Sequence, residues 1–315
     1  MKRHMLRLIS LIMLFPLVML GCIPGKHTET KTPDQPADDA TQPTTEPAAE
    51  PLDWDTNKDG KLKILFIGNS FSNDTADHFW HIATELLNAE VFVGNLGIGS
   101  CTLATHSNRI HFNKADYWYN YTDNGVWNSI QNTAPEEHIL SQNWDYISLQ
   151  QASADVGRPE KFSPHLENLI KHFQEKVPEA RIIWNMTWAF APNCPRVDVF
   201  DYYERDTDVM YNALIETVKS VIVPNESIYT IVPCGTAVQN IKGTQYYASL
   251  YYDGSHLNPG FGRYIAGLTL AATLIDPQLT NLTWKPNNVT AAQMEVAVFT
   301  AKSAVTNPFE LTPIQ

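Results

Sequence analysis

The sequence predicts an α/β protein built on a mostly parallel sheet. From residue 62 onward, apolar runs of strand length alternate with longer stretches that carry apolar residues at spacings of three and four. This alternation is typical of repeated βαβ units, in which buried parallel strands are continuously hydrophobic. The composition agrees, because 43% hydrophobic and 18% charged residues are usual for a globular protein.

Five strands and five helices are predicted. The strands are expected at 62–67, 90–93, 146–149, 181–188 and 227–232. The helices are expected at 75–87, 164–176, 207–221 and 259–274, with a fifth at 291–305 in a C-terminal tail that packs on the outside. An insertion at 105–126 is rich in tyrosine and tryptophan, and two interpretations stay open: its rings line a sugar site, or they pack the insertion onto the body.

The N-terminal 60 residues are predicted to lie outside the folded domain. Basic residues precede an apolar run at 8–20, which is typical of a signal peptide spanning 1–21. The run ends in Gly21-Cys22 and resembles a bacterial lipobox. This resemblance implies a lipid on Cys22 and an exported, membrane-anchored protein, and it leaves open which face of the membrane carries the protein. The alternative is a simple cleaved signal peptide. Residues 22–60 then form a disordered tether, the domain spans 61–276, and the helical tail spans 277–315. The stretch 55–60 looks like the start of a calcium loop, but Phe66 stands where the glutamate ligand belongs, so a turn is expected.

Charge and cysteine content exclude several function classes. A formal net charge of -12 argues against nonspecific nucleic-acid binding, which needs clustered Lys and Arg. No Cys-x-x-Cys or His-rich cluster suggests a zinc site, and no cofactor is implied. Besides Cys22, the odd set of Cys101, Cys194 and Cys234 allows at most one intramolecular disulfide; a Cys194–Cys234 pair is favoured because each follows a predicted strand.

Two short motifs carry residues suited to nucleophilic catalysis. Ser70 follows the first predicted strand and stands at a helix start, where free N–H groups face a developing negative charge. Asp253 precedes His256 by three residues, so a carboxylate can orient the imidazole and leave its other nitrogen for the serine. Because ligands bind beyond the carboxyl ends of parallel strands, we expect these groups to meet there.

These motifs resemble the first and last blocks of the SGNH/GDSL hydrolases. The resemblance is closest to an uncharacterised bacterial branch, a domain of unknown function, and covers roughly residues 62–275. It implies a three-layer α/β/α flavodoxin-like sandwich with a mostly parallel five-stranded sheet, with Ser70 as nucleophile and Asp253 and His256 as its partners. The motifs that carry it are Ile67-Gly68-Asn69-Ser70-Phe71, Asn95-Leu96-Gly97-Ile98-Gly99, Leu149-Gln150-Gln151-Ala152-Ser153, Thr187-Trp188-Ala189-Phe190 and Asp253-Gly254-Ser255-His256-Leu257.

The oxyanion hole departs from the family pattern. Its expected donors are the N–H groups of Ser70 and of Ser100, which replaces a glycine and follows Gly99, together with a glutamine amide in place of the usual asparagine. Gln151 is preferred for this role, and Gln150 is the alternative.

Four neighbouring positions are assigned to substrate binding: Asn69, Gly99, His106 and Trp188. For His106 a structural or surface role is the alternative. For Trp188 the alternative is core packing.

The sequence therefore predicts a serine esterase that needs no cofactor and acts outside the cytoplasm. Its expected partners are an ester substrate, an acylated glycan such as an O-acetylated polysaccharide, and the membrane through the lipid on Cys22. An α/β-hydrolase is disfavoured, because Ser72 stands where Gly-x-Ser-x-Gly needs its last glycine. The alternative from another class is a non-catalytic glycan-binding surface lipoprotein that keeps the fold.

Overall fold

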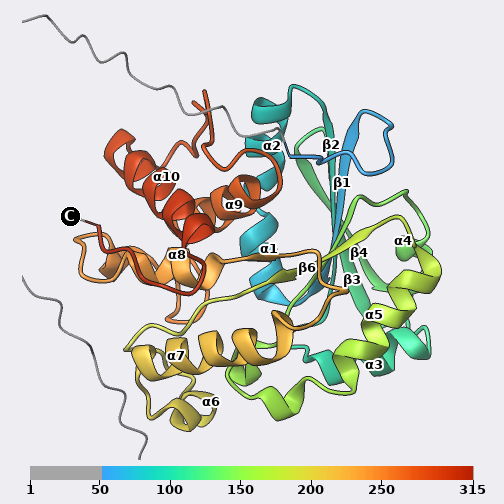
Figure 1. Cartoon of the computed structure of the whole chain (residues 1–315), viewed down its shortest axis with the longest axis horizontal. Helices are drawn as coiled ribbons and strands as arrows, with labels where there is room; N and C mark the ends of the chain where they lie inside the picture. Colours follow the sequence, from blue (N-terminus) through green and yellow to red (C-terminus); the bar gives the residue numbers. More distant parts are fainter. Residues whose placement is uncertain (1–51, 315) are drawn as a thin grey trace, which may run out of the picture. The chain divides into compact units, whose positions relative to one another are not determined.

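One seven-stranded sheet forms the centre of the computed structural model, which describes residues 52–314 (Figure 1). The sheet order is β4-β3-β2-β1-β5-β6-β7. This confirms the predicted α/β class with a mostly parallel sheet, and it corrects the strand number from five to seven. The strands are β1 (Lys61–Gly68), β2 (Glu90–Gly97), β3 (Tyr117–Asp123), β4 (Val126–Thr133), β5 (Tyr146–Leu149), β6 (Arg181–Asn185) and β7 (Thr230–Val232).

The five predicted strands form the parallel part, in the spatial order β2-β1-β5-β6-β7. Counted along the chain this is the 2-1-3-4-5 order of flavodoxin-like folds, in which the connections reverse direction beside the first strand. Strand β1 is buried from Leu62 to Ile67, which explains why all of these residues except Lys63 are apolar; the Lys63 ammonium pairs with Asp59. The reversal point lies beside the carboxyl end of β1, where Ser70 follows.

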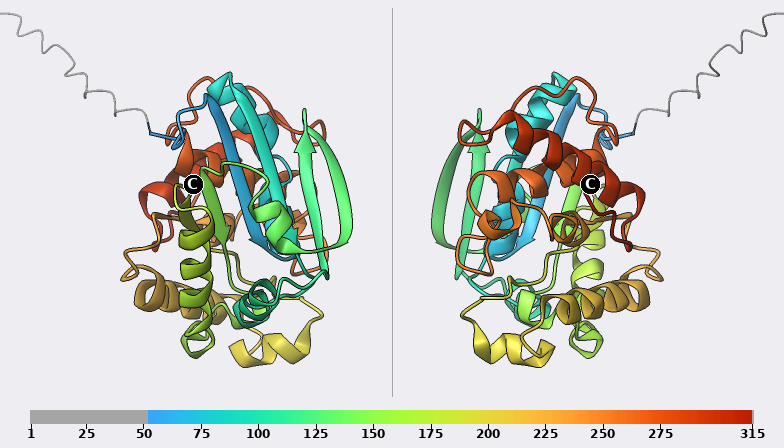
Figure 2. Two further views of the ribbon diagram at one scale, coloured as in Figure 1. Left: turned by 90° about the vertical axis from the view of Figure 1, so that its right-hand side faces the viewer. Right: turned by 90° about the vertical axis from the view of Figure 1, so that its left-hand side faces the viewer.

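Helices cover both faces of the sheet (Figures 1 and 2). On one face α1, α2, α8 and α10 pack around α9, whereas α3 and α5 lie together on the other face. The helices are α1 (Ser70–Ala76), α2 (Phe79–Leu87), α3 (Leu103–His111), α4 (Pro135–Ile139), α5 (His165–Lys176), α6 (Val197–Phe200), α7 (Thr207–Thr217), α8 (Cys234–Asn240), α9 (Phe261–Leu274) and α10 (Ala291–Thr306). Short turns are η1 (Ser153–Asp155), η2 (Pro159–Lys161), η3 (Asp201–Tyr203), η4 (Val218–Ile222) and η5 (Tyr247–Ser249).

The predicted insertion at 105–126 contains β3 and the first residue of β4, the two additional strands. Part of it belongs to α3, and the rest starts an antiparallel β3–β4 hairpin that pairs with β2. The hairpin turns at Asn124 and Gly125, whose φ angles of 49° and 79° match a two-residue turn of the kind that Asn-Gly favours. Tyr117 and Tyr119 alternate inward and are buried, so these rings pack the insertion onto the body.

Two other elements differ from expectation for local reasons. The helix predicted at 75–87 is interrupted between α1 and α2, where Asp77 pairs with Arg263 and His78 forms a hydrogen bond with the Pro259 carbonyl. The strand predicted at 181–188 ends at Asn185, because its neighbour β7 ends at Val232. Beyond that point the first turn of α8 lies beside the chain, and the Gly235 N–H donates to the Met186 carbonyl at 2.8 Å.

The C-terminal tail is part of the packed layer. Helix α10 begins with a capping box formed by Thr290 and Gln293. Its buried residues are small, with Ala297 and Ala301 allowing close approach to α8 and α9. Thr300 Oγ1 donates to the Ala237 carbonyl of α8 at 2.8 Å.

The segment before β1 is bound to the sheet from Thr56 onward. The buried Asp145 carboxylate accepts hydrogen bonds from the Thr56 N–H and hydroxyl and from the Lys63 N–H, each at 2.8 Å. The stretch 55–60 is a turn in which the Asp55 carboxylate accepts from the Asp59 and Gly60 N–H groups. The predicted tether therefore ends before residue 56. The predicted signal peptide and Cys22 lie outside the described residues.

The cysteine pairing favoured from the sequence is wrong. Cys101, Cys194 and Cys234 are free and buried in the described part of the chain. Cys234 Sγ lies 3.7 Å from the Ala266 carbonyl of α9, whereas Cys194 packs on the loop that carries Asp253. The two strands end at the same sheet edge, but their cysteines face different elements.

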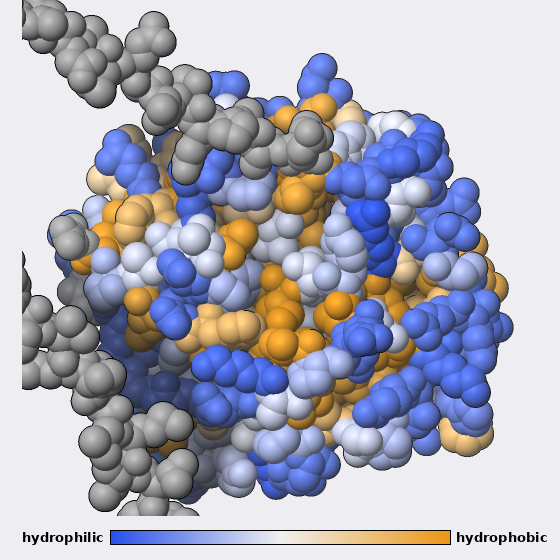
Figure 3. Space-filling model, in the orientation of Figure 1, coloured by the Kyte–Doolittle hydropathy of each residue, from blue (hydrophilic) through white to orange (hydrophobic). Residues whose placement is uncertain are grey.

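The surface is chemically mixed. Hydrophilic side chains dominate the right and lower margins of the view in Figure 3, and hydrophobic atoms gather near its centre. Among residues 52–314, no helix is both long and apolar enough to span a bilayer.

Candidate active site

A serine, a histidine and an aspartate form a hydrogen-bonded chain at the carboxyl end of β1. Ser70 Oγ lies 2.6 Å from His256 Nε2, and His256 Nδ1 lies 2.7 Å from Asp253 Oδ2. Ser70 is the first residue of α1, and the other two belong to the loop that precedes α9. The carboxylate accepts from Nδ1–H, which leaves Nε2 to accept the hydroxyl proton. The structure thus brings together the three residues predicted from the motifs.

The carboxylate of this chain is held in its ionised form. Asp253 Oδ1 accepts from the N–H groups of Ser255 and His256 at 2.9 and 2.8 Å, and from the Ser255 hydroxyl at 2.9 Å. Partial burial acts to raise the pKa of Asp253, but the hydrogen bonds from His256 and Ser255 outweigh it and hold the pKa well below its usual range. An ionised Asp253 can stabilise an imidazolium.

A glycine gives the loop its tight course. Gly254 has a φ angle of 86°, a region that disfavours other residues. A Cβ atom at this position would also lie 2.7 Å from the Cys194 Cα. The Gly254 carbonyl accepts from the Ala191 N–H at 2.8 Å, so the loop is fixed to the segment after β6. The residue between Asp253 and Ser255 must therefore be glycine.

Two buried side chains hold the backbone on either side of His256. Trp188 Nε1 donates to the Ser255 carbonyl at 2.9 Å, and Asp74 Oδ2 accepts from the Leu257 N–H at 2.9 Å. Trp188 also stacks on Phe71, the residue after Ser70, with ring centroids 4.7 Å apart. Both contacts therefore tie the imidazole to the helix that carries the nucleophile.

Asp74 was not identified from the sequence. It lies one helical turn after Ser70 and is buried, and its Oδ1 forms an ion pair with Arg263 Nε at 2.8 Å. Burial raises the pKa of Asp74 to about 6, although Arg263 and the Leu257 N–H favour the charged form. Asp74 stands one residue before the helix predicted at 75–87, so no apolar periodicity marked it as buried.

Of the residues predicted to form the oxyanion hole, some lie at the surface, whereas others are buried and hold segments of the chain together. Gly99 and Ser100 lie exposed in the turn after β2, and Ser70 opens α1, whose first N–H groups have no intrahelical partners. Gln151 does not face this site: its oxygen accepts from the Leu103 and Ala152 N–H groups and its nitrogen donates to the Lys161 carbonyl. Its amide holds three segments together.

Gln150 lies next to the nucleophile through Asn69. The Asn69 side-chain oxygen accepts from Gln150 Nε2 and from the Phe71 N–H, both at 2.9 Å, and its nitrogen donates to the Cys101 carbonyl. Asn69 is buried, so it caps α1 and joins it to β5 and to the turn that carries Ser100. This is an orienting role, not the exposed substrate contact that was predicted.

Two further predicted contacts are buried. His106 Nδ1 lies 2.9 Å from the Tyr117 hydroxyl, and burial lowers the pKa of His106 to about 4, so the ring is neutral. Trp188 is fully buried between Phe71 and the Ser255 backbone. Neither side chain lines the surface as it was expected to, because each fills space beneath the loops.

A pocket of about 420 Å³ opens beside Ser70 and His256. Its other lining residues come from α1, from the β3–β4 hairpin and from α9: Asn73, Asp74, Asp77, Asn120, Trp127, Asn128, Ser129 and Arg263. The sequence pointed to the tyrosines of the insertion, whereas the pocket is lined by Asn120 and by residues that follow the turn of the hairpin. The side chains facing the nucleophile are predominantly polar.

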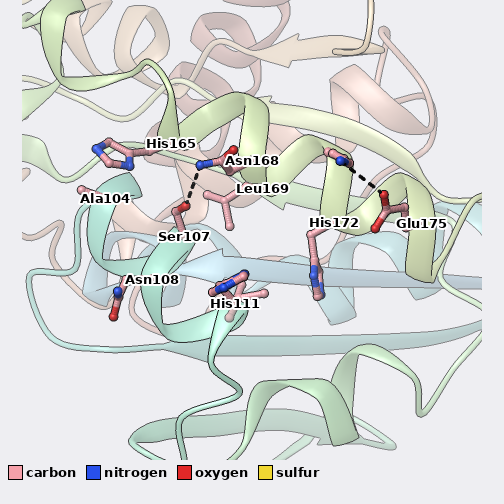
Figure 4. A pocket seen from close by; sticks show the side chains of 11 residues that line it. Ala104, Ser107, Asn108, His111, His165, Asn168, Leu169, His172 and Glu175 are labelled. Atoms are coloured by element: carbon pink, nitrogen blue, oxygen red, sulfur yellow. Dashed lines mark hydrogen bonds and ion pairs between the residues drawn. The ribbon is translucent and has the colours of Figure 1, made fainter.

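A second pocket of about 620 Å³ lies between α3 and α5, and Ser70, Asp253 and His256 are not among its lining residues (Figure 4). Three imidazoles, of His111, His165 and His172, line it, and Asn168 donates to Ser107 across the helix pair. The imidazoles are spread along the groove in Figure 4. Within residues 52–314, no group of three or more His, Cys, Asp or Glu side chains is placed to hold a metal ion.

The fold and the site define an α/β/α protein of flavodoxin-like topology that carries a Ser-His-Asp hydrogen-bonded chain. The model of the family described as a domain of unknown function, DUF4886, matches residues 63–304. The chain belongs to this family, and the match includes most of α10.

Solved structures are similar to the same part of the chain. A DUF4886 family protein from Bacteroides uniformis is 29% identical, with a TM-score of 0.76 over 81% of this chain and 98% of that one. A candidate SGNH hydrolase from Slackia heliotrinireducens is 23% identical, with a TM-score of 0.45 over 68% of this chain and 99% of that one. An acetylxylan esterase from Geobacillus stearothermophilus, solved as a catalytic mutant, is 16% identical, with a TM-score of 0.42 over 72% and 97%. No curated protein matches the sequence.

Proposed function

We propose that this protein is a serine esterase that hydrolyses O-acyl esters of glycans. The observation that carries the proposal is the 2.6 Å contact between Ser70 Oγ and His256 Nε2, with Asp253 ionised behind the imidazole. A serine hydroxyl becomes a useful nucleophile when an adjacent base accepts its proton and a third group orients that base. Successive groups of this Ser-His-Asp chain lie within hydrogen-bond distance of one another.

The reaction follows from this geometry. His256 Nε2 takes the Ser70 proton while Oγ bonds to the acyl carbon, and the carbonyl oxygen becomes an oxyanion. The oxyanion collapses, the bond to the alcohol oxygen breaks, and the imidazolium gives its proton to the leaving alkoxide. Water then repeats the sequence on the acyl-serine, which releases the acid and restores the hydroxyl.

The oxyanion is assigned to backbone N–H groups. Ser70 at the start of α1 and Ser100 in the exposed turn after β2 supply them, and Asn69 fixes the two segments relative to each other. Both glutamines are excluded from this role by the same criterion, because the Gln151 amide is used between loops and the buried Gln150 amide donates to the Asn69 side-chain oxygen.

Covalent labelling tests the proposal. A fluorophosphonate probe should label the wild-type protein and should not label Ser70→Ala. Ser72→Ala is the matched control, because Ser72 lies in the same helix but is buried and donates to the Asn69 carbonyl. Equal labelling of wild type and Ser70→Ala, or no labelling of a folded wild-type protein, would refute catalysis by Ser70.

One observation favours a second candidate, a glycan-binding protein without turnover. The side-chain donor preferred for the oxyanion hole, Gln151, is committed to the Lys161 carbonyl, and loss of one such donor costs roughly 3–4 kcal/mol of transition-state stabilisation. Glycan binding without probe labelling and without acetate release would support this candidate over the esterase.

Export and anchoring complete the proposal. The basic and apolar segment ending at Cys22 supports a lipid-modified protein outside the cytoplasm, where polysaccharides are available. Full-length protein should partition into the detergent phase of a Triton X-114 extraction, and Cys22→Ser should stay in the aqueous phase. Partitioning that does not depend on Cys22 would contradict the lipid anchor.

A further inference from the structure

We infer that the β3–β4 hairpin forms the subsite for the alcohol part of the ester, and that this subsite accepts an uncharged, polyhydroxylated alcohol such as a neutral sugar. The inference rests on the proposed function and deepens it. The pocket that the hairpin walls contains both Ser70 and His256, so a group bound there lies against the reacting serine and the proton donor for its leaving oxygen.

The hairpin is held rigidly enough to form a binding wall. Strand β3 pairs with β2, and the Val93 N–H donates to the buried Thr122 hydroxyl at 3.2 Å. The Trp118 ring covers the Gly97 backbone so closely that a Cβ there would lie 1.9 Å from it. At the tip, the Trp80 ring packs against Gly125. The hairpin is therefore fixed to the domain at its base and at its turn.

Side-chain amides of fixed orientation face the pocket. The Asn73 oxygen accepts from Asn95 Nδ2 at 2.6 Å and from Asn120 Nδ2 at 3.3 Å. The Asn73 N–H₂ group is therefore the end of this amide that a ligand can use. Ser129, which pairs with Asn120 and lies on the same face of the hairpin, adds a hydroxyl from β4. Such groups both donate and accept, which suits the hydroxyls of a polyol and does not suit an alkyl chain.

Trp127 supplies the single large apolar surface of the lining. Its Nε1 lies 3.4 Å from the Asp77 carbonyl oxygen, which fixes the indole against α1. The remaining lining is polar or charged, so the pocket offers one flat aromatic face among hydrogen-bonding groups. This combination matches a sugar ring, which has an apolar face of C–H groups and a polar edge.

The charges in the pocket disfavour anionic alcohols. Arg263 is the only cationic side chain among the lining residues, and it is already paired with Asp74 at 2.8 Å and with Asp77 at 3.2 Å. Two carboxylates and one guanidinium leave the lining net negative when both acids are ionised. A uronate or a phosphate would meet uncompensated negative charge and no free cation.

A substrate comparison with two hairpin variants tests the inference. Acetate release is measured on acetylated xylo-oligosaccharides, on acetylated oligogalacturonates and on 4-nitrophenyl acetate, which lacks a sugar. We expect the wild type to prefer the neutral sugar ester to the uronate ester. Trp127→Ala and Ser129→Ala should each lower kcat/KM for the neutral sugar ester, relative to that for 4-nitrophenyl acetate, by about tenfold, and Trp127→Phe should restore part of the loss.

Ile130→Ala is the matched control, because Ile130 lies on the same strand, is exposed and does not line the pocket. Its ratio of the two kcat/KM values should equal that of the wild type. Ser129→Lys should raise kcat/KM for the uronate ester about fivefold by placing a cation in the pocket. Equal use of both sugar esters by the wild type, or unchanged ratios in both alanine variants, would overturn the inference. Absence of all esterase activity would instead refute the proposed function.

Discussion

The contact between Asp74 and the backbone beside His256 leads to a quantitative prediction for Asp74→Ala. The substitution leaves the buried Leu257 N–H without its acceptor, which costs about 1–3 kcal/mol. It also removes a carboxylate whose ionisation is unfavourable, because burial raises its pKa to about 6; two pKa units correspond to about 3 kcal/mol. The two effects oppose each other, so global stability near pH 7.5 should change little.

The effect on catalysis has no such compensation. Without Asp74, the backbone at Leu257 is free to shift, and Trp188 holds the loop on one side of His256 only. Misplacement of a catalytic group by about 1 Å costs on the order of 10²-fold in rate. We therefore expect the acylation rate to fall by about 10- to 100-fold, measured by stopped-flow burst kinetics with 4-nitrophenyl acetate alongside thermal unfolding.

Asp145→Ala provides the matched control. Asp145 is also a buried carboxylate that accepts backbone N–H bonds, and burial also raises its pKa, but it precedes β5 at the end of the sheet opposite the active site. Its acylation rate per folded molecule should equal that of the wild type. If Asp74→Ala acylates at the wild-type rate with the wild-type pH profile, Asp74 does not position His256 and the reasoning fails.

Three further outcomes are expected. Asp253→Asn should reduce the fluorophosphonate labelling rate by about 10⁴-fold, because an amide cannot stabilise the imidazolium as a carboxylate does; a loss below tenfold would contradict the assigned role. Because folding raises the pKa of Asp74, protonation of its carboxyl stabilises the folded state. This contribution is complete below about pH 4 and is lost as the pH rises through about 6. Urea unfolding should therefore show the stability of wild type relative to Asp74→Asn falling by up to about 3 kcal/mol from pH 4 to pH 7, and a flat difference would show that Asp74 titrates normally. In full-length Cys22→Ser, Ellman's reagent in guanidinium without reductant should find all three remaining thiols, which react slowly in the native protein; a single reactive thiol would reveal a disulfide.

The local sequence pattern was sufficient to predict the parallel sheet and the residues of the Ser-His-Asp hydrogen-bonded chain. The five parallel strands were recognisable because a strand buried on both faces is almost continuously apolar, as in Ile64–Ile67 of β1. Ser70, Asp253 and His256 follow from motifs in which each residue stands beside a strand end or in a short turn. Their roles depend on short-range spacing, which a sequence displays directly.

Long-range side-chain contacts decided what the motifs left open. Gln151 and Gln150 are neighbours with the same chemistry, yet one holds loops together and the other contacts Asn69, because successive residues point in different directions. The sequence does carry a signal for the β3–β4 hairpin, because Asn124-Gly125 stands between strand-forming residues, but the pairing of this hairpin with β2 is a long-range contact.

The sequence by itself therefore determined the α/β class and the three residues of the Ser-His-Asp chain to which we assign the proposed catalysis. The tertiary structure decided which residues hold them in register and which form the pocket. Asp74 and Leu257 meet across 183 positions of the chain, and no periodicity in the sequence records such a meeting. It arises only when α1 and the loop before α9 pack at the same end of the sheet, where burial makes the Asp74 carboxylate an acceptor for the Leu257 N–H.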